Sequence, residues 1–153
     1  MRALVQRVRE ARVEVGGRTV GAIGPGLLVL LCAMRGDGLS EVDRLLAKLL
    51  KLRIFSDEQG RMNRSVQDVD GQGTPGGLLI VSQFTLAADT ASGNRPSFTL
   101  AAPPEDGRRL YALMLERAQA QHPVVASGEF AAHMQVHLIN DGPVTIPLDI
   151  APA

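Results

Sequence analysis

The sequence lacks the features that mark secreted or membrane-embedded proteins. It has a single cysteine, Cys32, so no disulfide can form within the chain, which suits a reducing compartment. Its longest apolar runs, near Leu27 and Leu78, fall well short of the roughly 20 residues that span a bilayer. The N-terminal residues from Met1 to Arg7 show no charged leader followed by a long apolar stretch. We therefore expect a cytoplasmic protein that does not contact membranes.

The chain also has no net charge, because 16 lysines and arginines balance 16 aspartates and glutamates. A neutral chain lacks the global positive field with which strongly basic domains follow DNA or RNA. It can still hold the last nucleotides of an RNA, since that needs only a local basic patch and a shaped pocket. We expect no DNA partner.

Motifs of the common hydrolases are missing as well. The sequence has no glycine-flanked serine elbow, no His-Glu-x-x-His, no paired cysteines and no phosphate-binding glycine loop. Cys32 lies in an apolar run, where core packing is favoured over catalysis. His133, Gln135 and His137 would share one face of a strand over residues 130–139, but no third ligand accompanies the histidines. We predict no metal and no cofactor.

Hydrophobic periodicity predicts an α/β fold. We expect one layered domain over residues 1–150, followed by a tail at 151–153, in which two main helices cover a mixed, curled β-sheet. A polar, glycine-rich loop over 56–77 separates its halves, with a surface insertion from Asp70 to Gly77. Strands are expected at 3–8, 11–15, 27–31, 78–86 and within 129–150, with 19–23 joined to 11–15 by a hairpin turn at Gly16-Gly17, and helices at about 40–55 and 105–121.

The sequence also predicts the ends of the first helix and the role of its basic side chains. Ser40 is predicted to be the N-cap of the first helix, which should end near Phe55. Its Arg44, Lys48 and Lys51 share one side, where a solvated face is favoured over contact with RNA phosphates.

The segment Ser82-Gln83-Phe84-Thr85 places polar groups at the end of an apolar strand, where sheets often present ligand-binding groups. Thr85 can be read as a nucleophile, but the sequence names no base to activate it. The alternative is a strand end whose hydroxyls bond neighbouring backbone. Gly142-Pro143, after Asn140-Asp141, reads as a turn.

These motifs resemble those of the D-aminoacyl-tRNA deacylases. The segment from Ser82 to Asp89, followed by Arg95-Pro96-Ser97-Phe98, is similar to one family signature. The segment from Asn140 to Thr145, preceded by Met134-Gln135-Val136, is similar to a second. The resemblance extends from Gln6-Arg7-Val8 to about Ile150, and it departs at Ala131, where glycine is common, and at His133.

The resemblance implies a homodimer in which a cis Gly142-Pro143 bond from one subunit enters the active site of the other. A rigid main-chain wedge would reject L-aminoacyl groups by collision and admit D-aminoacyl groups or glycine. The implied reaction is hydrolysis of the ester in D-aminoacyl-tRNA, and of glycyl-tRNA mischarged on tRNA-Ala, with help from the substrate's ribose 2′-hydroxyl.

Site roles follow from the same resemblance. Ser82, Gln83 and Thr85 would form the pocket and orient the substrate at the tRNA acceptor end. Phe84, Phe130 and Met134 would line the pocket, and Arg7 would orient the loop of Gly142 and Pro143. Two other functions stay open: hydrolysis of a small ester with Thr85 or Ser82 as nucleophile, and binding of charged tRNA ends without turnover.

Overall fold

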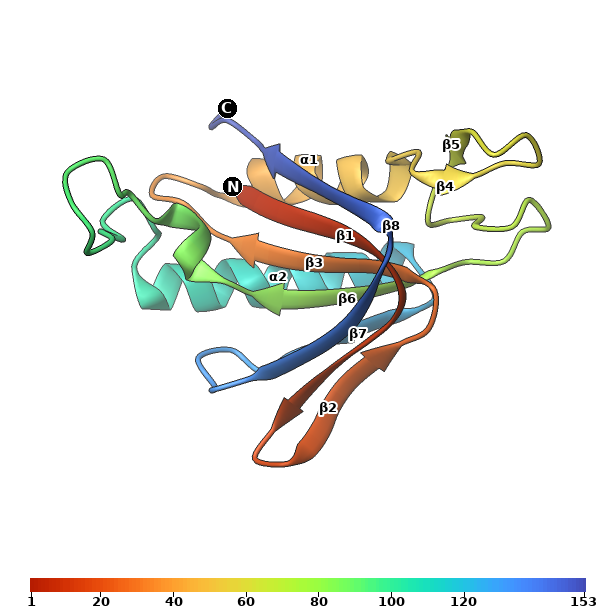
Figure 1. Cartoon of the computed structure of the whole chain (residues 1–153). Coiled ribbons are helices and arrows are strands. Elements are labelled where there is room, and N and C mark those ends of the chain that lie inside the picture. Colours follow the sequence, from red (N-terminus) through yellow and green to blue (C-terminus); the bar gives the residue numbers. More distant parts are fainter.

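The computed structural model describes residues 1–153 and builds them around one large curled sheet (Figure 1). Both helices lie on the same face of this sheet. The elements in chain order are β1 (Arg2–Val15), β2 (Arg18–Ile23), β3 (Gly26–Cys32), α1 (Leu39–Lys51), β4 (Phe55–Ser56), β5 (Met62–Arg64), β6 (Gly77–Ser82), the 3-10 helix η1 (Phe84–Ala87), α2 (Pro104–Gln121), β7 (Val125–Ser127) and β8 (Gln135–Asp149).

The sheet is mixed, and its curl follows from the length of β1. One edge of β1 pairs first with β3 and then with β2, while the other edge pairs with β8 along most of its length, all antiparallel. β3, β6 and β7 run parallel to one another. The predicted mixed, curled sheet with two covering helices is therefore confirmed, although residues 3–8 and 11–15 belong to one continuous strand.

Alternating side chains of the sheet form two apolar layers. Leu27, Val29, Leu78 and Ile80 pack with the buried faces of α1 and α2, where Leu45 is among the fully buried residues. A smaller cluster occupies the concave face and contains Val8, Val13, Leu28, Leu79 and Val81. Burial on both faces explains why β3 and β6 are continuous apolar runs. Cys32 is 1% exposed, as predicted for a core residue.

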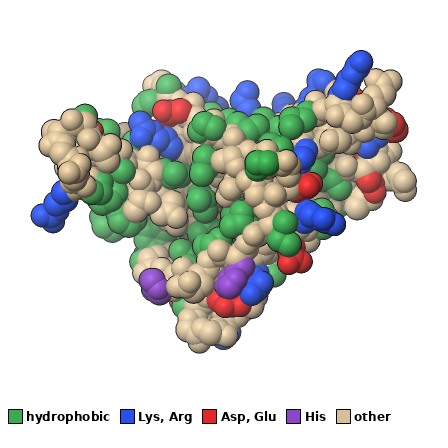
Figure 2. Space-filling view, in the orientation of Figure 1, with side chains coloured by type: hydrophobic (Ala, Val, Ile, Leu, Met, Phe, Trp, Pro, Cys, Tyr) green, Lys and Arg blue, Asp and Glu red, His purple; other side chains and the backbone are tan.

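Charged and hydrophobic side chains both reach the face of the molecule drawn in Figure 2. Lysine and arginine side chains gather along the upper edge in this view, where Figure 1 places α1 and the β4–β5 hairpin. A band of hydrophobic side chains crosses the middle of the same face. Neither helix is long and apolar enough to cross a membrane.

The boundaries of α1 differ from the prediction. Gly38, not Ser40, is the N-cap, and its N–H donates to Oε2 of the buried Glu41 at 2.8 Å. Glutamate three residues after the cap accepts from the N–H of the cap residue, which is one half of a capping box, whereas the bond that a serine side chain accepts from the first turn has no counterpart because glycine has no side chain. The helix ends at Lys51 because Leu52 is already extended (φ −65°, ψ 119°).

Other boundaries also needed correction. The strand expected over 78–86 ends at Ser82, and Phe84–Ala87 forms η1 instead. The loop over 56–77 contains the short β4–β5 hairpin, because β4 and β5 pair antiparallel. The strand expected over 130–139 begins only at Gln135.

Candidate functional site

A cavity of about 640 Å³ opens beyond the carboxyl ends of β3 and β6. This is the edge at which parallel sheets usually bind ligands. Its walls come from the ends of these strands, from η1, from the start of α2 and from the loop before β8. None of its lining residues is Asp, Glu, Lys or Arg; the titratable side chains among them are Cys32, Tyr111 and His133. The cavity is therefore an apolar pocket with a few polar groups at one end.

The predicted residues Ser82, Gln83 and Phe84 line this cavity, whereas Thr85 does not. The backbone N–H of Gln83 donates to the Leu31 carbonyl at 2.7 Å, which fixes the strand end against β3. The side-chain Nε2 of Gln83 donates to Thr85 Oγ1 at 2.5 Å. Thr85 thus accepts a hydrogen bond from an amide, and it has no hydrogen bond to a group that could act as its base.

Phe130 and Met134 also line the cavity. The Phe130 ring lies against Tyr111 of α2, with 5.9 Å between ring centroids. Tyr111 is fixed in turn, because its hydroxyl donates to the Ile80 carbonyl at 2.8 Å. Ala131, the expected departure from glycine, adopts a positive φ of 64°, a conformation that favours glycine.

Cys32 also lines the cavity without being suited to nucleophilic attack. Its thiol is buried and donates to the carbonyl of Phe84 at 3.5 Å. Burial raises the pKa of the Cys32 thiol, so the reactive thiolate is disfavoured. His133 lies before β8, with its Nε2 3.2 Å from Gln135 Nε2. The histidines do not share a strand face, and no cluster of three His, Cys, Asp or Glu side chains could hold a metal ion.

Gly142 and Pro143 lie in β8 rather than in a hairpin turn, and the peptide bond between them is cis. The register between β1 and β8 shifts here, with Gln6 opposite Thr145 and Val8 opposite Asn140. The four residues between Asn140 and Thr145 therefore bulge from the ladder. Both Gly142 and Pro143 are exposed.

Arg7 ties this bulge to the segment before β4. Its Nε donates to the Asp141 carbonyl at 3.0 Å, and its Nη1 donates to the Ile54 carbonyl at 2.7 Å. Asn140 braces the other side, because its Oδ1 accepts from Val144 N at 3.0 Å. Arg7, Gly142 and Pro143 are absent from the cavity lining, so the structure does not bring the two groups of predicted residues together within one chain.

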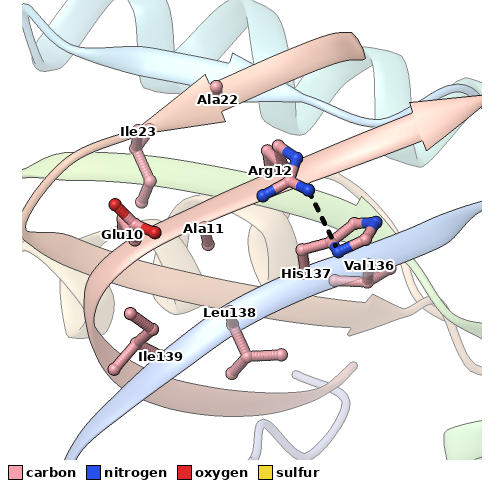
Figure 3. A pocket seen from close by; sticks show the side chains of 9 residues that line it. All are labelled: Glu10, Ala11, Arg12, Ala22, Ile23, Val136, His137, Leu138 and Ile139. Carbon is pink, nitrogen blue, oxygen red and sulfur yellow. Dashed lines mark hydrogen bonds between the residues drawn. The ribbon is translucent and has the colours of Figure 1, made fainter. Parts of the chain in front are cut away.

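A second hollow, of about 540 Å³, lies over β1, β2 and the first half of β8 (Figure 3). Its floor is apolar, and Arg12 and His137 stand at one side. The Arg12 Nη2 and His137 Nδ1 atoms are 3.2 Å apart, and both side chains contact Glu14. A hydrogen bond from Arg12 is the main cause that lowers the pKa of Glu14. The hollow contains none of the predicted site residues.

Tyr111 allows a direct test of the cavity wall, because it is the only tyrosine in the chain. Burial raises its pKa to about 12 from 10.0. A group whose pKa is raised on folding stabilises the fold below its unfolded pKa and loses that contribution as pH rises through the folded value. We expect stability to fall between pH 10 and 12, with tyrosinate absorbance appearing only near pH 12. Tyr111→Phe should lose this dependence, and a titration midpoint near 10 in the folded protein would contradict the burial of the Tyr111 hydroxyl.

Sequence reasoning missed several residues of the cavity. Phe98 packs edge-on against Phe84 with 5.1 Å between centroids, and Ala101 and Gly107 complete the wall. The isolated bridge between Met34 and Ala101 brings this segment to the site. Phe98 belongs to the segment Arg95-Pro96-Ser97-Phe98, which resembles a family signature. For Ala101 and Gly107 no comparable indication is present in the sequence.

Comparisons with known proteins place the chain in a family. The family model described as D-Tyr-tRNA(Tyr) deacylase matches residues 4–149. The D-aminoacyl-tRNA deacylase of Acidovorax ebreus (strain TPSY) is 72% identical over 152 residues, covering 99% of each chain. That of Delftia acidovorans (strain DSM 14801 / SPH-1) is 69% identical over 153 residues, covering 100% of this chain and 98% of the relative.

Two solved structures share the fold of this chain. A protein titled c-Myc DNA Unwinding Element Binding Protein superposes with a TM-score of 0.90 at 42% identity, covering 99% of both chains. A probable eukaryotic D-amino acid tRNA deacylase shares the fold, with a TM-score of 0.70 at 18% identity over 97% of this chain and 98% of the other. From its match over nearly the whole length, this chain belongs to the D-aminoacyl-tRNA deacylase family.

Proposed function

We propose that this protein hydrolyses the ester bond of D-aminoacyl-tRNA and releases the free D-amino acid and the tRNA. The observation that carries the proposal is a largely apolar cavity with polar groups from Ser82 and Gln83 at one end and no acidic or basic side chain other than His133. Such a cavity can hold the aminoacyl end of a tRNA, and the high identity to curated deacylases supports this substrate. Its volume is in the range of about 300–1,000 Å³ typical of small-ligand pockets.

The proposal includes a homodimer, because the Gly142-Pro143 bulge lies outside the chain's own cavity. A second copy can bring the exposed bulge to the cavity mouth. There the main chain of Gly142 and Pro143, held by Arg7, would obstruct the side chain of an L-aminoacyl group. D-Aminoacyl groups would fit past it. A rigid obstruction discriminates more strongly than attraction to an apolar surface.

Glycine has no side chain to collide with the bulge, so the same site should admit glycyl-tRNA mischarged on tRNA-Ala. The filter proposed here therefore separates L from D without distinguishing D from glycine. Deacylation of glycyl-tRNA by the purified protein tests this extension.

We propose further that the substrate's own ribose 2′-hydroxyl assists the cleavage. Thr85 contacts Gln83 rather than a base, and the Cys32 thiol is protonated and buried. Water supplies the hydroxyl that bonds to the ester carbonyl carbon, the bond from that carbon to the ribose oxygen breaks, and the leaving ribose oxygen takes the remaining proton of the water. In this scheme Ser82 and Gln83 orient the ester, and Phe84, Phe130 and Met134 enclose the aminoacyl-adenosine.

Thr85→Ala separates this scheme from a threonine nucleophile. We expect the variant to keep deacylation of D-tyrosyl-tRNA within about tenfold of the wild type, because only an orienting contact to Gln83 is lost. A nucleophile would lose several orders of magnitude. Single-turnover assays measure the difference, and near-abolition would disprove substrate assistance.

The rival functions are tested with the same protein. A hydrolase of small esters should cleave D-tyrosine ethyl ester, which lacks the ribose 2′-hydroxyl, at a rate comparable to D-tyrosyl-tRNA. We expect this ester to be stable. Stable binding of D-tyrosyl-tRNA without any turnover would instead indicate a binding module.

A further inference from the structure

We propose that Arg108 binds the phosphate that links the last two nucleotides of the tRNA and so positions the acceptor end over the cavity. This inference rests on the proposed function. Arg108 lies in the first half of α2, next to Gly107, which lines the cavity. Its guanidinium carbon lies 4.6 Å from the centroid of the Phe130 ring, on the cavity wall.

Arg108 has no acidic partner in the structure. It is exposed and makes neither an ion pair nor a hydrogen bond, so its five N–H donors are open to a ligand. The neighbouring Arg109 is paired instead, with its Nη2 3.6 Å from Asp106 Oδ1. Arg2 and Arg35, near the same cavity, already donate to the carbonyls of Leu86 and Thr99.

The contact with Phe130 should hold the Arg108 guanidinium in a fixed position for phosphate binding. The Phe130 ring contacts both the guanidinium of Arg108 and the ring of Tyr111, whose hydroxyl donates to the Ile80 carbonyl of the sheet. Stacking on an aromatic face restricts the guanidinium while leaving its N–H groups free at the edge. A planar guanidinium can then bind two phosphate oxygens at once.

The chemistry of the substrate matches this position. An aminoacyl-adenosine that fills the cavity has its first phosphate on the far side of the ribose, at the cavity mouth. The cavity lining contains no lysine or arginine to meet that charge. Three carboxylates are close in sequence to Arg108 or to Phe130, namely Glu105, Asp106 and Glu129. Of these, Asp106 forms an ion pair with Arg109. Arg108 lies outside this lining, against Phe130 of the wall, and is an unpaired cation beside the cavity.

The test compares Arg108→Gln with Arg109→Gln, which removes the same charge one residue away. We measure kcat/KM on D-tyrosyl-tRNA from low to high salt. Arg108→Gln should lower kcat/KM by about tenfold at low salt through KM, and flatten the slope of log kcat/KM against log salt by about 0.7, the share of one phosphate on a single strand. Arg109→Gln should leave both quantities close to wild type.

Arg108→Lys keeps the charge and distinguishes binding from packing. It should recover most of the low-salt activity, because an ammonium still binds phosphate. A loss in Arg108→Gln that does not change with salt and appears in kcat would overturn the proposal and assign Arg108 to the support of Phe130. Wild-type activity in Arg108→Gln would also overturn it. Failure of the wild type to cleave D-tyrosyl-tRNA at all would instead refute the proposed function.

Discussion

Gly142→Ala should lower deacylation of D-tyrosyl-tRNA by at least about 100-fold, because a displaced bulge no longer leaves the space in the partner's cavity that the D-aminoacyl group occupies, and a displacement near 1 Å at a site costs about that much. Gly142 has a φ of +137°, which side chains rarely adopt. An added Cβ would lie 2.7 Å from Val144 Cγ2 and 3.1 Å from Arg7 Nη2. The bulge must shift, and Val144 is buried and cannot give way freely. A variant that melts like the wild type and still cleaves the D-ester at the wild-type rate would contradict the role of the bulge.

Mixed dimers show whether the bulge acts in the partner's cavity. Gly142→Ala subunits keep an intact cavity, and Phe130→Ala subunits keep an intact bulge. In a heterodimer of the two, one cavity meets an unaltered bulge if the site is shared between subunits. Equal mixing should then restore about a quarter of the sites, since half of the dimers are mixed and each has one complete site. If the bulge served its own subunit, mixing would restore nothing.

Gly26→Ala should prevent the chain from folding to a stable state, because it should lower the free energy of unfolding by more than about 4 kcal/mol. Gly26 opposes Gly77 where the parallel strands β3 and β6 begin. A Cβ on Gly26 would lie 2.1 Å from the Gly77 carbonyl oxygen and 2.6 Å from its nitrogen. Both atoms belong to backbone, so relief requires the two strands to separate.

The control for Gly26→Ala lies two residues away. A Cβ on Gly24 would meet nothing within 4 Å, and Gly24 has no positive φ. The free energy of unfolding of Gly24→Ala should therefore lie within about 0.5 kcal/mol of the wild-type value. Urea unfolding followed by circular dichroism compares the variants, and equal midpoints for the two substitutions would contradict the close approach of β3 and β6.

The pattern of apolar residues predicted the main helices and strands, because each of these elements has its buried side chains at regular spacing within one short segment. Leu27–Leu31 and the run from Leu78 read as buried strands, and both are. Ends were less predictable, since they depend on single hydrogen bonds. The start of α1 is set by Glu41, and its end by the backbone of Leu52.

The site was partly predictable for the same reason. Ser82, Gln83 and Phe84 follow a recognisable strand, and they line the cavity. The contact of Arg7 with the Ile54 carbonyl joins positions that no periodic pattern connects, so only the resemblance pointed to Arg7. Phe98 and Tyr111 come from a loop and a helix that meet the site through tertiary packing alone.

The most direct test of the account is deacylation of D-tyrosyl-tRNA and L-tyrosyl-tRNA by the purified protein, side by side, with a metal chelator present. We expect rapid loss of the D-ester and survival of the L-ester, at rates that the chelator does not change. Equal cleavage of both esters would contradict the filter formed by Gly142 and Pro143, and cleavage of neither would contradict the proposed reaction itself.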